Sequence, residues 1–270
     1  MSAAPRRAVL LDLDNTLILE DESTFVAIRA AAALIRGVDP EMFATSVAAI
    51  ADRRWKKAPV VRDAERFGIW WGEALWGDFS GTDPVSRAVR AFAPEFRDAV
   101  WRDAATQVNG DEALGPRLGA AYIASRRSAE TIDPDAEPML ADLSRDHRLA
   151  LVTNGAGDVQ REKLSRTPFA PHFAAIVVSS EIGVGKPEPA IFQHALAALG
   201  AAASDAVMVG DSLERDVAGA HAAGVKAIWI DRKLWKERDT RPDARIERLS
   251  DLRAALDVLE RRPASPRATL

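Results

Sequence analysis

Two aspartates, one residue apart, close the first apolar run of the chain. In the stretch AVLLDLDNT, four apolar residues lead directly into Asp12, Leu13 and Asp14. Side chains alternate along a strand, so the two carboxylates start on the same face. They repel each other unless a positive charge lies between them or one of them stays protonated. Mg²⁺ takes oxygen ligands and commonly uses one or two carboxylates plus a substrate phosphate, so we expect a magnesium site here.

Polar residues also follow three later apolar runs. The runs RLALVTN and DAVMVGD end in such residues, and a lysine lies in the loop after FAAIVVSS. In open α/β sheets, ligands bind beyond the carboxyl ends of the strands. We therefore expect these side chains to converge with the two aspartates; they are Thr153, Asn154, Lys186 and Asp211. Of these, Asp211 would supply a further metal ligand.

Such a set of side chains fits phosphoryl transfer. One carboxylate can attack phosphorus and form an aspartyl-phosphate, which water later hydrolyses. A second carboxylate two residues on can protonate the leaving oxygen and then deprotonate the water. The Thr153 hydroxyl and the Lys186 ammonium would position the phosphoryl oxygens and stabilise their charge.

The elements that must carry these residues alternate between apolar strands and helices. Strand-like runs cover 8–13, 148–154, 173–180, 205–211 and 225–230. Helical patterns precede the second, fourth and fifth runs, and the last two of these patterns close at Gly200 and Gly224, where a left-handed cap is expected. This alternation predicts an α/β fold, a doubly wound, Rossmann-like parallel sheet.

The segment after the first strand breaks this alternation. STFVAIRAAAALIRG predicts an amphipathic helix that ends at Gly37. Asp39-Pro40 and Asp83-Pro84 each predict an N-cap followed by a proline at the first helical position. Four more helical patterns and no convincing strand fit here, so we predict an inserted all-helical cap domain.

The length and composition of the chain allow a core and a second, smaller domain. The chain has 270 residues and is 47% hydrophobic, which is enough for one core and a smaller second domain. We assign 1–19 and 126–260 to the α/β core, 20–125 to the helical cap, and 261–270 to a disordered tail.

Charge and cysteine content exclude several classes of function. A net charge of −4 gives no reason to expect nucleic acid or a membrane as partner. The chain has no cysteine, which excludes disulfides, thiolate metal sites and a cysteine nucleophile. No apolar run approaches the ~18 residues of a membrane-spanning helix. We expect a soluble, cytoplasmic enzyme, either a monomer or a homodimer.

Four motifs, in order, resemble the signature motifs of the haloacid dehalogenase (HAD) superfamily. They are DLDNT, LVTNG, GKPEPAIF and VGDSLERD. The helical segment between the first two resembles the C1 cap of that superfamily. The longer stretches VTNGAGDVQREKL and VMVGDSLERDVAGAHAAGVKAIWI are similar to the N-acylneuraminate-9-phosphatase-like and pyrimidine-nucleotidase-like phosphatases of the C1-capped branch.

The resemblance implies a role for each motif residue. Asp12 would be the nucleophile and Asp14 the general acid and base. Phosphate would be bound by Thr153, Asn154 and Lys186. Mg²⁺ would be held by Asp12, the backbone carbonyl of Asp14, and Asp211, with Thr16 and Asp216 in supporting positions.

The function implied is Mg²⁺-dependent hydrolysis of a small phosphorylated metabolite, such as a sugar phosphate or a nucleotide. One alternative is a metal-free haloacid dehalogenase on the same fold. That branch usually has an aromatic residue where this chain has Asp14, and it needs no metal-binding acid at the position of Asp211. A second alternative is a non-hydrolytic phospho-acceptor or binding protein, which turnover would distinguish from a phosphatase.

Two groups of cap residues are candidates for substrate selection. The stretch DRRWKKAP supplies Arg53, Arg54 and Lys56, which form either a solvated helix face or a basic lip that recognises a second anionic group. Trp70 and Trp71 form either part of the cap core or a wall that stacks on the substrate. The solvated face and the cap core are the more common outcomes for such residues.

Overall fold

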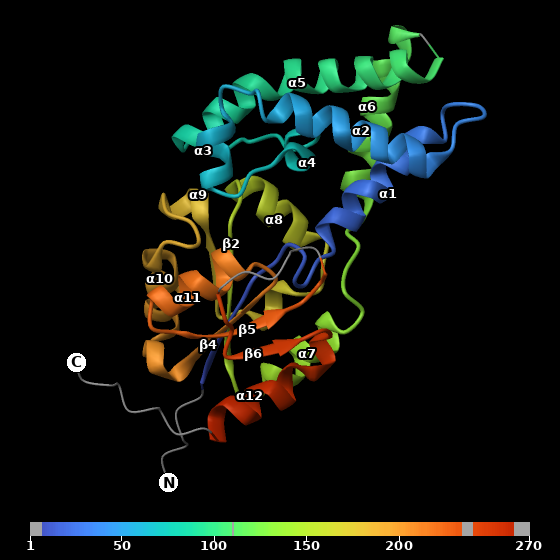
Figure 1. Ribbon diagram of the computed structural model, residues 1–270. Coiled ribbons are helices and arrows are strands. Elements are labelled where there is room, and N and C mark those ends of the chain that lie inside the picture. The colour runs from blue at the N-terminus through green and yellow to red at the C-terminus, as the bar shows by residue number, and fades with distance from the viewer. Residues whose placement is uncertain (1–6, 110, 234–239, 262–270) are drawn as a thin grey trace.

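The computed structural model describes residues 7–109, 111–233 and 240–261, and Figure 1 shows a sheet part with a layer of helices beyond one end of it. Apart from the backbone of residue 261, the tail predicted over 261–270 lies outside the described residues.

A six-stranded parallel sheet forms the centre of the sheet part, in the order β3-β2-β1-β4-β5-β6. Its strands are β1 (Ala8–Leu11), β2 (Arg148–Thr153), β3 (Ala175–Val178), β4 (Ala206–Gly210), β5 (Lys226–Ile230) and β6 (Ala244–Ile246). The five predicted strands are confirmed to within two residues at each end. The edge strand β6 was not predicted, because three residues with an arginine at their centre carry no apolar run.

Both faces of the sheet are buried, as expected for parallel strands. Alternate residues of β1 face opposite sides, so Val9 and Leu11 join one apolar cluster while Ala8 and Leu10 join another. The cluster around Val9 is completed by α7 (Ala136–Leu143) and α12 (Leu252–Arg261). The cluster around Leu10 is completed by α10 (Pro189–Leu199) and by the segment that contains α11 (Gly219–Ala222). The doubly wound α/β fold is therefore confirmed.

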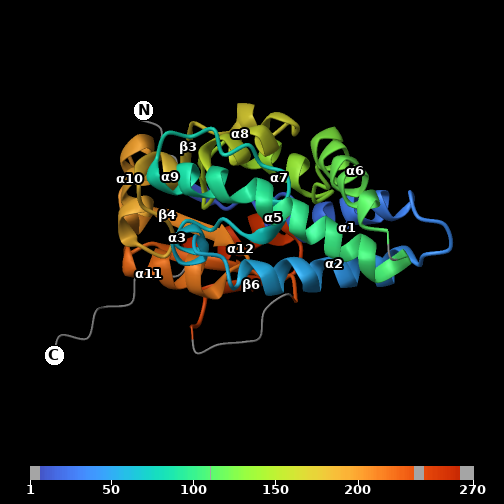
Figure 2. The ribbon, with the colours of Figure 1, turned by 90° about the horizontal axis from the view of Figure 1, so that it is seen from above.

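Between β1 and β2, the described residues from Glu20 to Ser128 form a helical layer. Its helices are α1 (Glu20–Ala32), α2 (Pro40–Trp55), α3 (Val61–Arg66), α4 (Trp71–Ala74), α5 (Pro84–Asn109) and α6 (Gly115–Ser128), with a 3₁₀ turn at Glu112–Leu114. Figure 2 looks down on this layer, where α5 and α2 lie side by side. Aromatic residues fill its core, with Trp55, Trp76 and Trp101 all buried.

Asp39 and Asp83 cap two helices of this layer, as predicted. The Asp39 carboxylate accepts hydrogen bonds of 2.9 Å from the backbone N–H groups of Glu41 and Met42, at the start of α2. The Asp83 carboxylate accepts a 2.8 Å bond from the N–H of Ser86, at the start of α5. In both cases the side chain satisfies backbone donors that have no partner within the helix.

The layer is seated over the carboxyl ends of β1 and β2. There it packs on α8 (Gly157–Ser165), whose Val159 belongs to the apolar core of the layer. Polar contacts join the two parts as well: Ser80 donates to Asp158, and Ser179 donates to the carbonyl of Phe67 at 3.0 Å. The short helix α9 (Ser179–Ile182) and 3₁₀ turns at 170–172, 203–205 and 249–251 complete the sheet part.

The longest helix, α5, has 26 residues, yet neither it nor any other described helix carries the apolar stretch that a membrane crossing requires.

Candidate active site

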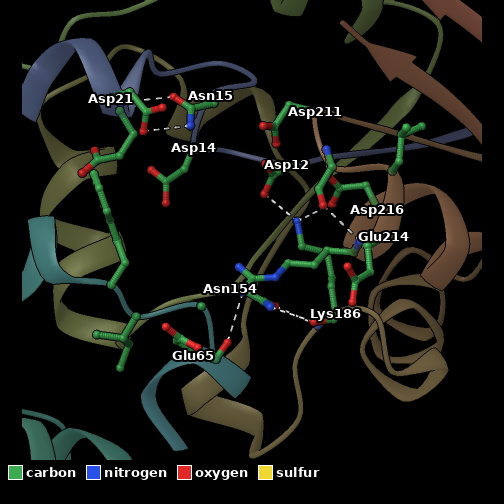
Figure 3. Close-up of a pocket in the computed structure, with 17 residues that line it drawn as sticks. Asp12, Asp14, Asn15, Asp21, Glu65, Asn154, Lys186, Asp211, Glu214 and Asp216 are labelled. Atoms are coloured by element: carbon green, nitrogen blue, oxygen red, sulfur yellow. Dashed lines mark hydrogen bonds and ion pairs between the residues drawn. The ribbon is translucent and has the colours of Figure 1, made fainter. Parts of the chain in front are cut away.

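A cavity of about 520 Å³ lies where the helical layer meets the carboxyl ends of the strands (Figure 3). The predicted residues among its lining are Asp12, Asp14, Asn154, Lys186, Asp211, Asp216 and Trp70. They come from β1, β2, β4 and two loops of the sheet part, and from the helical layer. The structure therefore brings together side chains that lie up to about two hundred positions apart in the sequence.

Asp12 lies at the end of β1 and is almost fully buried, with 6% of its surface exposed. Its Oδ1 is 2.5 Å from the Lys186 ammonium, and its Oδ2 accepts a 3.2 Å hydrogen bond from the Thr16 hydroxyl. Burial raises the pKa of Asp12, and the neighbouring Lys186 limits that rise. The Thr16 hydroxyl thus holds one oxygen of this carboxylate.

Lys186 lies between two carboxylates, those of Asp12 and Asp216. Its Nζ is 2.7 Å from Asp216 Oδ1. Burial alone would lower its pKa, but Asp12 and Asp216 outweigh that effect and raise the pKa to about 12. The lysine is therefore a permanent cation at neutral pH, as a phosphate-binding group should be.

Asp216 is held in place by the segment that follows β4. That segment, Leu213–Ala218, is a single π-helical stretch rather than the start of the continuous α-helix expected there. The Asp216 Oδ2 accepts a 2.9 Å hydrogen bond from the N–H of Ser212. A Cβ at Gly210 would lie only 2.2 Å from this same oxygen, so only glycine lets the carboxylate pack on the end of β4.

The Asn154 side chain holds the Lys186 loop rather than pointing freely into the cavity. Its Nδ2 donates to the Lys186 carbonyl at 2.9 Å, and its Oδ1 accepts from the Lys186 N–H at 2.8 Å. These two bonds occupy both ends of the amide. The geometry favours a positioning role for Asn154, in place of the direct phosphate contact expected from the motif.

Asp14 occupies a different environment from Asp12. Its side chain is about a quarter exposed to the cavity, and both of its oxygens lie close to the Lys163 ammonium, at 3.0 and 3.1 Å. Gln160 Nε2 donates to Asp14 Oδ2 at 2.9 Å and to the Thr153 hydroxyl at 2.7 Å. Gln160 thereby ties Asp14 to the buried residue Thr153.

Gln160 and Lys163, the two α8 residues that hold Asp14, were not predicted from the sequence. A signal was present in the sequence, because both lie on the helix face that carries the buried residues Val159 and Leu164. A glutamine and a lysine on an apolar face need a polar partner.

The carboxylates next to Lys186 have the chemistry of a Mg²⁺ site. Asp12, Asp211 and Asp216 each offer one oxygen, and these oxygens lie within 4.8 Å of one another. Carboxylate oxygens at such spacing suit a hard divalent cation. The grouping contains two of the predicted ligands and the supporting residue Asp216, while the Asp14 carboxylate is turned toward Lys163.

Of the five cap candidates for substrate selection, only Trp70 lines the cavity. Arg54 pairs with Asp103 at 2.7 Å within the helical layer, and Lys56 pairs with Asp52, also at 2.7 Å. Arg53 is exposed at the end of α2, and Trp71 packs against the layer's core. The described cavity lining thus contains none of the three basic side chains proposed as a lip.

Comparison with known proteins gives three kinds of match. The family model of the haloacid dehalogenase-like hydrolases matches residues 6–224. A phosphoserine phosphatase of Thermus thermophilus is 39% identical over 248 residues, which are 91% of this chain and 97% of that protein. An N-acylneuraminate-9-phosphatase of Rattus norvegicus is 36% identical over 142 residues, so the match spans about half of this chain and 57% of that relative.

Among solved structures, the HAD-hydrolase YfnB from Bacillus subtilis, bound to magnesium, superimposes with a TM-score of 0.64. The match covers 94% of this chain and all of that one, at 20% sequence identity, and so supports the fold.

Proposed function

The chain belongs to the haloacid dehalogenase-like hydrolase family, and on this premise we propose that it is a Mg²⁺-dependent phosphomonoester hydrolase that works through an aspartyl-phosphate. The resemblance of its four motifs to that family is thereby confirmed. The proposal assigns the attacking group, the proton-transfer group, the phosphate ligands and the metal ligands to named residues.

The observation that carries the proposal is the different environment of the two strand-end carboxylates. Asp12 is buried beside the Lys186 ammonium, whereas Asp14 faces the same cavity from a separate set of partners on α8. Two carboxylates kept apart in this way can take two roles in one reaction. A protein that only bound phosphate would need no second carboxylate of this kind.

In the proposed reaction, an Asp12 oxygen attacks phosphorus, and the bond from phosphorus to the leaving oxygen breaks. Asp14 passes a proton to the leaving oxygen and afterwards takes one from the water that hydrolyses the aspartyl-phosphate. Lys186 and the Thr153 hydroxyl bind the phosphoryl oxygens. In the structure, the Thr153 hydroxyl accepts a hydrogen bond from Gln160 and donates a 3.4 Å hydrogen bond to the Asn154 carbonyl, so it would turn this proton toward a substrate oxygen to bind it.

The metal would be held by Asp12, Asp211 and the backbone carbonyl of Asp14, with Asp216 beside them. When bound, Mg²⁺ would neutralise the negative charge of the carboxylates and of the phosphoryl group that must approach them.

For the substrate, we place phosphorylated amino acids first. The phosphoserine phosphatase relative aligns over almost its whole length, and a phosphorylated amino acid was not among the examples of a small phosphorylated metabolite named from the motifs. The cavity wall offers both charges that an amino acid needs. Among the described lining residues, Arg215 is the cation besides Lys186, and it donates a 3.2 Å hydrogen bond to the Glu65 carbonyl. Glu65 and Glu214 are acids of the same lining (Figure 3).

The test is phosphate release from a panel of phosphomonoesters, with Mg²⁺ and with EDTA. The panel contains phosphoserine, sugar phosphates, a nonulosonate 9-phosphate and nucleoside monophosphates. We expect Mg²⁺-dependent turnover of one class, absent from Asp12→Asn. A parallel haloacid panel covers the dehalogenase alternative, and halide release without phosphate release would overturn the proposal.

A further inference from the structure

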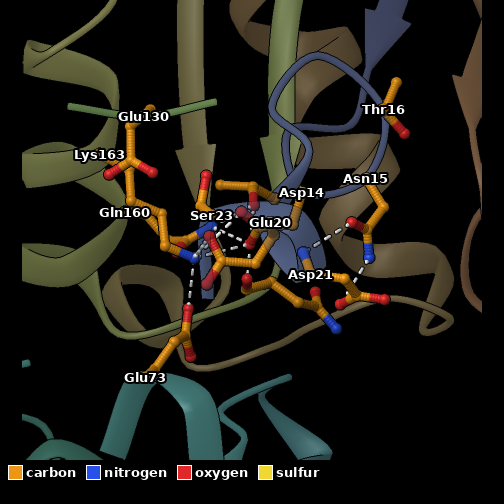
Figure 4. Close-up of polar contacts among 12 residues, drawn as sticks. Asp14, Asn15, Thr16, Glu20, Asp21, Ser23, Glu73, Glu130, Gln160 and Lys163 are labelled. Carbon is orange, nitrogen blue, oxygen red and sulfur yellow. Dashed lines mark hydrogen bonds and ion pairs between the residues drawn. The ribbon is translucent and has the colours of Figure 1, made fainter. Parts of the chain in front are cut away.

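Lys163 is a fully buried lysine that is not among the described lining residues of the cavity, yet it lies next to Asp14 (Figure 4). None of its side chain is exposed. Burial alone would lower its pKa, but Asp14, Glu20 and Glu73 outweigh that effect and raise the pKa well above the ordinary value. A buried ammonium of this kind is stable only while its carboxylate partners stay in place.

The three carboxylates around Lys163 come from three different segments. Asp14 follows β1, Glu20 is the first residue of α1, and Glu73 lies in α4. The Lys163 Nζ is 3.3 Å from Glu20 Oε2 and 2.7 Å from Glu73 Oε1. Glu73 belongs to the helical layer, and 1% of its surface is exposed. Its second oxygen, Oε2, has no hydrogen-bond partner among the described residues. Among the described residues, the interaction with Lys163 is the main one that offsets the burial of Glu73, and Arg126 adds a weaker attraction.

We propose that Lys163 is a positioning residue for Asp14 and that Glu73 makes this positioning depend on the seating of the helical layer over the sheet. The inference rests on the proposed function, because it assigns the proton-transfer role to Asp14. Lys163 holds both oxygens of Asp14, and Gln160, one turn earlier on α8, holds one of them.

The coupling follows from which contacts the layer carries. If the layer lifts away, α4 takes Glu73 with it, and Lys163 loses its shortest ion pair while it gains access to water. Asp14 is then paired with a lysine that is hydrated and less constrained. The acid and base of the reaction would thus be correctly oriented when the substrate is enclosed and poorly oriented when the cavity is open.

The first test is steady-state kinetics of Lys163→Met, which keeps the length of the side chain and removes its charge. A misplaced proton-transfer group costs about a hundredfold in rate, so we expect kcat to fall by about that factor. The KM should stay within about threefold, because Lys163 does not bind substrate. Lys163→Arg, which keeps the charge, should recover part of the rate. An unchanged kcat, or a change confined to KM, overturns the proposal.

The second test is a double-mutant cycle between positions 73 and 163. Glu73→Gln should lower kcat by about fivefold in the wild-type background and have no further effect in Lys163→Met. The same fold loss in both backgrounds would show that Glu73 acts independently of Lys163, which contradicts the coupling. If Lys163→Met does not fold, the cycle is run with Lys163→Gln, which also removes the charge.

A matched control is Arg253→Met, which removes an ion-paired cation of the sheet part far from the cavity and should leave kcat unchanged. Crystal structures separate this inference from the proposed function. If the wild type releases no phosphate, the proposed function fails, and the Asp14 position in Lys163→Met still decides the inference. A displaced carboxylate supports it, and an unmoved one overturns it.

Discussion

Asp12 and Asp14 differ in what surrounds them, and each should therefore give a different defect when it is neutralised. Asp12→Asn keeps the shape of the side chain but removes the attacking oxygen, so kcat should fall by at least about a thousandfold. Asp14→Asn should slow hydrolysis of the aspartyl-phosphate and let it accumulate. Acid-quenched, ³²P-labelled protein distinguishes the two variants. Near-normal turnover by Asp12→Asn would disprove the covalent route.

Gly210 is the residue whose absent side chain makes room for Asp216. In Gly210→Ala, the new Cβ would lie 2.2 Å from Asp216 Oδ2 and 2.3 Å from its Cγ, so the carboxylate must move. Overpacking of this kind costs about 1–3 kcal/mol of unfolding free energy. We expect that loss in urea titrations, together with at least a tenfold drop in kcat/KM, since Lys186 loses a partner. Wild-type values for both would contradict the role given to Asp216.

Arg215 allows a test of the proposed substrate class by comparison of two substrates. Its side chain lines the cavity and donates a 3.2 Å hydrogen bond to the carbonyl of Glu65. If it binds the carboxylate of a phosphorylated amino acid, Arg215→Met should raise the KM for phosphoserine by about tenfold. The KM for phosphoethanolamine, which lacks that carboxylate, should not change. Equal effects on both substrates would argue against this contact.

The motif residues could be predicted from sequence, but their partners could not. Asp12, Lys186 and Asp211 follow apolar runs, and runs of that kind place them at one edge of the sheet. The partners Lys163 and Glu73 lie in different helices, and nothing local in the sequence shows that both are buried and face each other. Asn154 lies at the predicted place, but its role depends on a loop geometry that spacing does not determine.

At the scale of elements, ion pairs hold α12 against the end of α7. Arg253 donates to both oxygens of Asp146 at 3.0 Å, and this bonding lowers the pKa of Asp146 well below its usual value of 3.8. A lowered pKa stabilises the folded state above pH 3.8, and that stabilisation is lost as the pH falls below it.

Asp146→Asn should therefore lower the free energy of unfolding at pH 7 by about 0.5–1 kcal/mol, a modest amount because the pair is half exposed. The difference from the wild type should shrink as the pH falls from about 4 to about 2, because the Asp146 carboxylate of the unfolded chain becomes protonated there while that of the folded protein stays ionised. Urea unfolding at several pH values measures this. A difference that stays constant over that range would mean that the ion pair does not contribute.

Elements with a strong local signal were predicted correctly. The five longer strands follow from their apolar runs, α2 and α5 from Asp-Pro caps, and the end of α10 from Gly200, which has a φ of 60°. The first predicted helix, expected to end at Gly37, ends earlier at Ala32. The π-helical geometry of Leu213–Ala218 was not predicted, since it accompanies the tertiary ion pair that Asp216 makes with Lys186.

At the scale of the whole molecule, the metal should stabilise the fold that assembles its site. Three acidic residues from two strands and a π-helical segment meet there, and a ligand that binds only the folded state stabilises it. Saturating Mg²⁺ at about 100 times its Kd adds about 2.7 kcal/mol, or several degrees in Tm. Calorimetry with Mg²⁺ and with EDTA should show this shift in the wild type and in the surface variant Asp103→Asn, and not in Asp211→Asn.

The strand that leads into Asp12, β1, is synthesised well before the two strands that flank it in the sheet. Ala8 pairs with Arg148 on one side and with Ala206 on the other, 140 and 198 residues further along the chain. At about 5–20 residues per second, the first partner follows on the order of ten seconds later. Throughout this interval β1 is an apolar strand with two bare edges, open to chaperones or to other nascent chains. The helical insertion therefore also sets how long the nascent enzyme is vulnerable to misassociation.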